Sequence, residues 1–132
     1  MTLRHPTLNR IILNLARSKE FPQGSSRHGY DLVAPLDSQG HIDLAAWKAS
    51  RADCTVRRFW EGQDDETGML VYKGGSGKRS RWIFDYDPEL PDDDEAGFLF
   101  GAHAFVPGEY VSIRGGDGKM HTFVVRSVTP LP

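Results

Sequence analysis

The sequence predicts an all-β fold with one short helix, a small antiparallel β-barrel or sandwich of about eight strands. Three observations support this prediction. The 14 glycines and 8 prolines are spread along the chain and divide it into short segments of strand length. Several segments alternate apolar and polar residues, as a strand with one buried face does. One segment lacks β-branched residues and follows a helix cap. We expect a barrel rather than a sandwich, because the strands are short and closure removes their edges.

The first half of the chain is predicted to contain two strands and the helix. Residues 10–17 alternate apolar and polar side chains and favour a strand, although Leu8, Ile11, Ile12 and Leu15 also match the spacing of a helix. Residues 21–26 are typical of a loop and residues 29–36 of a second strand. A turn is expected at 37–40, and a helix at 44–50 with Asp43 as its N-cap.

The second half of the chain is predicted to contain only strands. The clearest signal is the alternation of Trp82, Phe84 and Tyr86, which should place these rings on one mostly buried face. Glycine-rich segments at 74–80 and 115–118 are expected to be hairpin loops. The expected strands cover residues 54–61, 69–73, 81–87, 97–104, 110–114 and 121–129.

Length and composition indicate one globular domain over residues 1–132. The chain is 39% hydrophobic and 26% charged, with 16 basic and 18 acidic residues and a net charge of −2. This balance gives no general attraction to nucleic acid or to an anionic membrane. The apolar run at 11–16 is short and broken by Asn14, so it predicts neither a signal peptide nor a membrane span. We expect a cytoplasmic protein.

Cys54 is the single cysteine, which excludes an internal disulfide and every zinc site built from several cysteines. A lone cysteine at a strand start is more typical of core packing than of catalysis. The histidines show no HExxH spacing, and no serine lies in a Gly-x-Ser-x-Gly motif. We therefore predict no catalytic motif, no metal site and no cofactor, and a non-enzyme is the preferred interpretation.

A basic glycine-rich loop is the candidate anion-binding segment, with Lys78, Arg79 and Arg81 as its cations. It is not a Walker motif, because Arg79 stands where serine or threonine is required. Seven carboxylates follow within residues 85–95 and would oppose a polyanion. A solvated hairpin tip and a solvated acidic loop are the preferred interpretations, and nucleic acid is not an expected partner.

Residues 57–60 interleave two arginines with Phe59 and Trp60 on one predicted strand. With Arg81 and Trp82 they could form a surface on which bases stack, as in proteins that bind single-stranded nucleic acid. Strand alternation favours the opposite outcome, since it sends neighbouring side chains to opposite faces. A ligand site assembled from distant residues is also possible, and its candidates are His28, Arg58, Trp60 and His103.

Two resemblances concern short stretches of the chain. Residues 105–113, Phe-Val-Pro-Gly-Glu-Tyr-Val-Ser-Ile, resemble a strand motif of flavin-dependent reductase barrels. This resemblance implies a barrel strand but no flavin, because Arg114 is followed by Gly-Gly-Asp instead of the family's Arg-x-Tyr-Ser segment. As a whole, the chain resembles a bacterial family of short conserved proteins without an assigned function. That impression rests on the segments 24–25, 28–30, 58–60, 82–87 and 107–113.

Two classes of function follow from these observations. The preferred one is a non-catalytic binding or protein-interaction module on a small β-barrel. The alternative is a small-molecule-binding protein or small enzyme whose site combines distant histidine and arginine residues. A barrel filled by its own side chains would favour the first class, and a ligand-sized apolar cavity inside it would favour the second.

Overall fold

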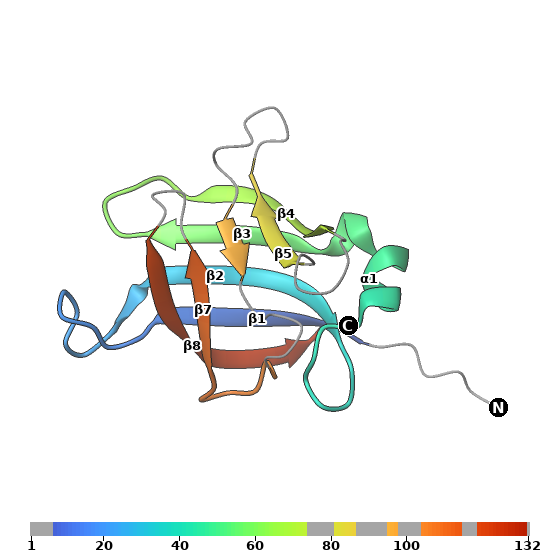
Figure 1. Cartoon of the computed structure of the whole chain (residues 1–132), viewed down its shortest axis with the longest axis horizontal. Coiled ribbons are helices and arrows are strands. Elements are labelled where there is room, and N and C mark those ends of the chain that lie inside the picture. The colour runs from blue at the N-terminus through green and yellow to red at the C-terminus, as the bar shows by residue number, and fades with distance from the viewer. Residues whose placement is uncertain (1–6, 74–80, 87–94, 98–103, 115–118, 132) are drawn as a thin grey trace.

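The computed structural model describes residues 7–73, 81–86, 95–97, 104–114 and 119–131 (Figure 1). Each strand pairs antiparallel with the next one along the chain, and the last strand pairs with the first, so that the described strands form a closed barrel. The elements are β1 (Thr7–Leu15), β2 (Ser25–Leu36), α1 (Leu44–Ala49), a short 3₁₀ turn (Arg51–Asp53), β3 (Thr55–Trp60), β4 (Glu66–Lys73), β5 (Arg81–Asp85), β6 (Glu95–Gly97), β7 (Tyr110–Arg114) and β8 (Met120–Pro130). The all-β prediction and the preference for a barrel are confirmed.

The helix prediction is confirmed together with its cap. The side chain of Asp43 accepts a hydrogen bond from the Ala46 amide at 3.0 Å, which satisfies one of the free N–H groups at the helix start. The turn at 37–40 is also confirmed, because the Asp37 carboxylate accepts from the Gln39 amide at 2.8 Å. The segment at 10–17, for which a helix was an alternative, is the strand β1 as far as Leu15.

Several predicted boundaries are wrong; β4, for example, begins at Glu66 and not at Met69. Ser25 and Ser26 belong to β2 instead of a loop, because the chain pairs with β1 beyond the irregularity between Asn14 and Leu15. Glu95 begins β6, where an acidic loop was expected, and pairs with Phe84. The strand expected at 97–104 does not reach Ala104, and the next residue, Phe105, donates its amide to the Gly40 carbonyl. Residues 98–103 and the turn at 115–118 lie outside the described residues.

The barrel interior is filled by its own side chains. Tyr30 lies near its centre, with its ring centroid 5.0 Å from that of Phe84 and 5.1 Å from that of Phe123. Aliphatic residues from β1, β2, β3, β4, β7 and β8 complete the core. Cys54 is buried in this core, as expected, and burial raises the pKa of its thiol to about 11. The described side chains thus form a packed core at the centre of the barrel.

The helix closes one end of the barrel, which we call the helix end. Trp47 of α1 is buried, and its indole Nε1 donates to the Leu70 carbonyl at 2.9 Å. Its ring meets Trp82 edge-on at 5.3 Å, and Trp82 packs on Tyr72 at 5.0 Å. Trp82 and Phe84 are buried, so the expected buried face of β5 is confirmed for these two rings, whereas Tyr86 is partly buried and lies in the bend just after the strand. Ile83, between them, is buried as well.

Candidate functional site

The opposite end of the barrel, which we call the pocket end, is where β1 and β3 finish and where β2 and β8 begin. Figure 1 shows the β1–β2 and β3–β4 loops together on the left, away from α1 on the right. Strand register places His28 opposite Trp60, and Tyr30 opposite Arg58. Directly opposed residues share a face of the sheet. Tyr30 faces the core, so its opposite residue, Arg58, also lies on the interior face. His28 and Trp60 are two residues further along their strands toward this end and lie on the same face.

An imidazole stacked among aromatic rings forms the base of the site. His28 is only 4% exposed. Its ring centroid lies 4.5 Å from that of Trp60 in an edge-on contact and 4.7 Å from that of Phe21. Trp60 in turn meets His121 of β8 edge-on at 5.9 Å, and the Arg58 guanidinium lies 4.6 Å above the indole ring. Side chains from the β1–β2 loop, β2, β3 and β8 therefore meet in one cluster around His28 and Trp60.

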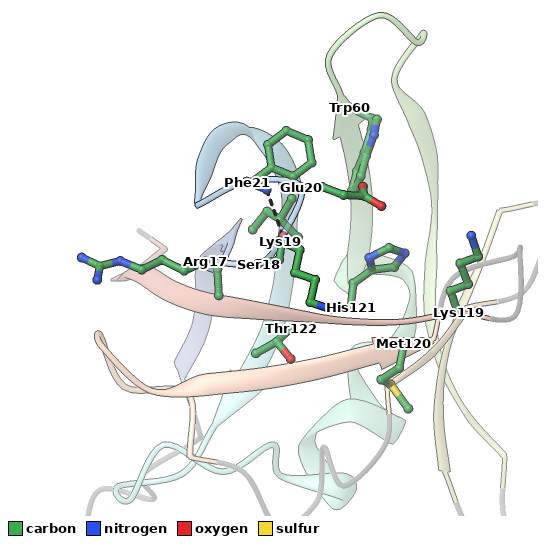
Figure 2. A pocket seen from close by; sticks show the side chains of 12 residues that line it. Arg17, Ser18, Lys19, Glu20, Phe21, Trp60, Lys119, Met120, His121 and Thr122 are labelled. Atoms are coloured by element: carbon green, nitrogen blue, oxygen red, sulfur yellow. Dashed lines mark hydrogen bonds between the residues drawn. The ribbon is translucent and has the colours of Figure 1, made fainter. Parts of the chain in front are cut away.

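A pocket of about 330 Å³ opens beside this cluster. Phe21, Trp60 and Met120 give it apolar walls, and Met120 is 48% exposed. Figure 2 shows Trp60 and His121 reaching toward a common space, with Lys19 and Lys119 on either side of His121 in this view. The pocket lies at the lower end of the size range of roughly 300–1,000 Å³ that is typical of ligand sites.

The pocket is electropositive although the chain as a whole is acidic. Arg17, Lys19 and Lys119 line it against a single carboxylate, that of Glu20, whereas the chain carries a net charge of −2. Within the described part of the chain, Arg17 and Lys19 form no ion pair. Arg17 and Lys19 therefore place two exposed cations next to aromatic surface.

The acidic residues of the neighbouring β3–β4 loop are partly neutralised. Glu61 forms an ion pair with Arg27 at 2.9 Å, and Asp65 forms one with Arg57 at 2.9 Å. Asp64 and Glu66 are exposed in and after the same loop and carry the remaining charge there. Neither of them lines the pocket. The positive charge of the pocket is thus not cancelled by its own lining.

The structure brings three of the four predicted ligand-binding residues together. His28, Arg58 and Trp60 meet at the pocket end, whereas His103 lies outside the described residues. Of the predicted anion-binding residues, Lys78 and Arg79 also lie outside the described residues. Arg81 begins β5 opposite Lys73, where β4 ends, and is therefore at the helix end, away from the pocket.

Sequence reasoning missed Phe21, His121 and the pocket cations. Phe21 is in a loop, where no periodicity indicates which side chain turns inward. His121 follows the same alternation as the buried Phe123, so it belongs to the interior face of β8. Its proximity to Trp60 depends on the closure of β8 onto β1, which no local pattern reveals.

The proposed base-stacking surface does not exist as one face. Arg57 and Phe59 lie on the outside of the barrel, where the Arg57 guanidinium is 5.3 Å from the Phe59 ring. Arg58 and Trp60 are on the inner face, and Trp82 is buried at the helix end. The split expected from strand alternation is confirmed.

A second depression, of about 580 Å³, crosses the outer face near Arg57, Phe59 and Arg126. Of its two arginines, Arg57 is already paired. Arg57 binds Asp65 at 2.9 Å and Asp31 at 3.3 Å, and Arg10 binds Asp31 at 2.6 Å. Burial alone would raise the pKa of Asp31, but the hydrogen bonds and charges of these two arginines hold it below its usual value. This surface is therefore a weaker candidate for an anionic ligand.

A contact between Ser25 and His28 invites comparison with a catalytic dyad. Ser25 Oγ and His28 Nδ1 are 2.6 Å apart. However, Ser25 Oγ also accepts from the Arg27 amide at 3.1 Å, which is a local turn interaction. Neither Ser25 nor His28 lines the pocket. The arrangement fixes the imidazole beneath the aromatic rings and does not present an accessible nucleophile.

Among the residues that the structure describes, no group of three or more histidine, cysteine, aspartate and glutamate side chains is placed to hold a metal ion. No described helix is long and apolar enough to cross a membrane. The positions that distinguish the pocket end are aromatic and basic. Aromatic and basic side chains of this kind can contact an aromatic or anionic ligand.

Comparison with known proteins identifies no relative. No family model, no curated protein and no solved structure matches the chain. The resemblances to a bacterial family and to a flavin-reductase strand therefore stay predictions.

The buried His28 predicts a pH-dependent stability. Burial lowers its pKa below the usual value, the charge of Glu61 acts in the opposite sense, and the charge of Arg58 lowers it further. The imidazole of His28 therefore binds a proton more readily in the unfolded chain than in the folded one. Its contribution to the free energy of unfolding is present above about pH 6.5 and is lost as the pH falls below that value. We expect the free energy of unfolding to fall more between about pH 7 and pH 5 in the wild type than in His28→Gln.

Urea denaturation of both proteins at the two pH values measures this difference. His41→Gln serves as the control, because His41 lies in the turn at the helix end, away from His28. This variant keeps the buried His28 imidazole, so it should retain the extra loss of stability on acidification that His28→Gln removes. Equal slopes for the wild type and His28→Gln would contradict the prediction.

Proposed function

We propose that this protein is a non-catalytic binding module that recognises its partner with the pocket end of the barrel. The observation that carries the proposal is the convergence of Trp60, Phe21 and His121 beside a basic pocket, while the barrel interior is filled. Partly exposed aromatic side chains in a concave site are the typical anchors of protein interfaces. A filled core leaves the surface as the place for recognition.

The closed sheet supports recognition by side chains. Each described strand has a neighbour on both sides, so no free edge among them can add a partner strand. A partner must therefore be bound by pockets and charges. The pocket end offers both, whereas Trp47 blocks the helix end from the inside.

The alternative function is that of a small-molecule-binding protein or small enzyme. It is favoured by the meeting of His28 of β2 with Arg58 and Trp60 of β3, beside a pocket that Trp60 lines and that is large enough for a small ligand. The burial of His28 argues against its use as a catalytic base, because the pocket does not reach it.

Affinity capture from a cell extract tests the proposal when variants are compared side by side. We expect a set of proteins retained by the wild type and by the control Lys73→Glu at the helix end, and lost from Trp60→Ala and Lys19→Glu. Retention of the same proteins by all four would refute recognition at the pocket end. A small molecule that co-purifies with the wild type and not with Trp60→Ala, identified by mass spectrometry, would support the alternative instead.

A further inference from the structure

We propose that the pocket end binds an acidic peptide segment that carries one aromatic anchor residue. This inference rests on the proposed function and adds the chemistry of the partner. It is argued from the shape of the pocket, from its charge and from the closed sheet.

The pocket has room for one anchor side chain. Its volume of about 330 Å³ accommodates a ring with its immediate neighbours but not a long buried segment. The walls already present ring edges and faces, from Trp60, Phe21 and His121. Aromatic rings favour edge-on and offset contacts with one another, which gives an aromatic anchor an advantage over an aliphatic one of similar size.

The charges around the pocket favour acidic residues on either side of that anchor. Lys19 and Lys119 lie on either side of His121 in Figure 2, and Arg17 lines the same pocket. Carboxylates that flank the anchor would meet the exposed cations of Lys19 and Arg17, while a basic peptide would be repelled by them. Because the cations of Lys19 and Arg17 are exposed, they contribute to specificity and to the rate of association more than to affinity.

Nucleic acid is a less suitable occupant for the same site. A polyanion needs a basic track that follows several phosphates. The pocket instead holds only a few cations together with Glu20, and the chain is acidic overall. A short acidic peptide avoids this carboxylate more easily than a long phosphate backbone does.

The experiment is a set of anisotropy titrations with fluorescein-labelled pentapeptides. The probe is Glu-Glu-Phe-Glu-Glu, compared with Glu-Glu-Ala-Glu-Glu, which lacks the anchor, and Lys-Lys-Phe-Lys-Lys, which reverses the charge. We expect saturable binding of the first probe only. Added salt should weaken this binding, because exposed ion pairs are screened.

Variants of the protein locate the binding. Trp60→Ala should weaken binding of the acidic probe by about thirtyfold, the effect of losing an aromatic hot spot. Lys19→Glu should weaken it by about fivefold, and Lys73→Glu at the helix end should leave it unchanged. Lys19 is exposed and distant from the core, so this variant remains informative even if Trp60→Ala does not fold.

Other outcomes overturn the inference in distinguishable ways. Binding of the alanine or lysine peptide that is lost in Trp60→Ala would refute an acidic aromatic ligand and keep the proposed function. Trp60-dependent binding of adenosine monophosphate or of a labelled oligonucleotide, without peptide binding, would replace the peptide by a nucleotide. Trp60-dependent self-association in sedimentation would assign the pocket to a second copy. Peptide binding that no pocket variant alters would refute both proposals.

Discussion

An alanine at position 29 is expected to prevent the barrel from closing. Gly29 lies in β2, paired with Asn14 of β1 on one side and with Phe59 of β3 on the other. A Cβ atom there would lie 1.8 Å from the Leu13 carbonyl oxygen and 2.9 Å from its carbon. These are backbone atoms of the adjacent strand, so no side-chain rotation relieves the clash.

The cost of this substitution should exceed about 4 kcal/mol, which is exceptional for a single substitution. Total stabilities of domains are only about 5–15 kcal/mol, so we expect Gly29→Ala to be largely unfolded or to melt without cooperativity. Far-ultraviolet circular dichroism and urea denaturation measure the effect. The Phe59 ring, 3.1 Å from the added atom, would have to move as well.

Gly62→Ala is the matched control for this prediction. Gly62 has a φ of 85°, but no heavy atom lies within 4 Å of an added Cβ. Its substitution should cost only the backbone strain of a left-handed residue, about 1–2 kcal/mol. Suppose that Gly29→Ala unfolds cooperatively and loses no more free energy of unfolding than Gly62→Ala. The prediction that β1 and β2 approach too closely for a Cβ atom at position 29 would then be wrong.

Replacing Trp82 by alanine is expected to cost about 3–5 kcal/mol, the range for deleting a large buried ring. Trp82 is only 4% exposed and is held between Trp47 and Tyr72. Removing it leaves a void that the surrounding strands cannot fill without distortion. The loss should appear as a lower midpoint in chemical denaturation.

The same substitution should also release the helix. A helix of six residues is too short to be stable without tertiary contacts, and α1 is anchored through Trp47. We expect faster amide hydrogen exchange in α1 of Trp82→Ala than in the wild type. Met120→Ala, which alters an exposed side chain, should change stability by less than about 0.5 kcal/mol. A neutral result for Trp82→Ala would place that ring in solvent and support a recognition surface on β5.

The fold could be predicted to the extent that local patterns determine it. The aromatic residues at alternate positions from Trp82 onward indicate a buried strand face directly. Asp43 indicates the helix start because its side chain caps the helix through a hydrogen bond to Ala46, only three residues away. The end of the strand expected at 97–104 could not be predicted in this way. Phe105, just beyond this segment, is not part of a strand and donates its amide to the carbonyl of Gly40, a residue far away in the sequence.

The candidate site was predictable only in part for the same reason. His28 and Trp60 stand out as aromatic and titratable residues near strand ends, and the β2–β3 register brings them together. Phe21 and Lys19 reach the pocket through an irregular loop, and His121 reaches it through the pairing of the first and last strands. Such contacts depend on barrel closure, which has no signature within a short window of sequence.

The pairing of β1 with β8 has a consequence for the order of folding. Seven of the eight strand pairings join neighbours along the chain, which close short loops at a small entropic cost. The eighth joins Ile11 to Val128 and encloses nearly the whole chain. Contacts between such distant residues form slowly. We therefore expect an open, curled meander to form before the closed barrel. The pocket takes residues from both β1 and β8, so it should form last.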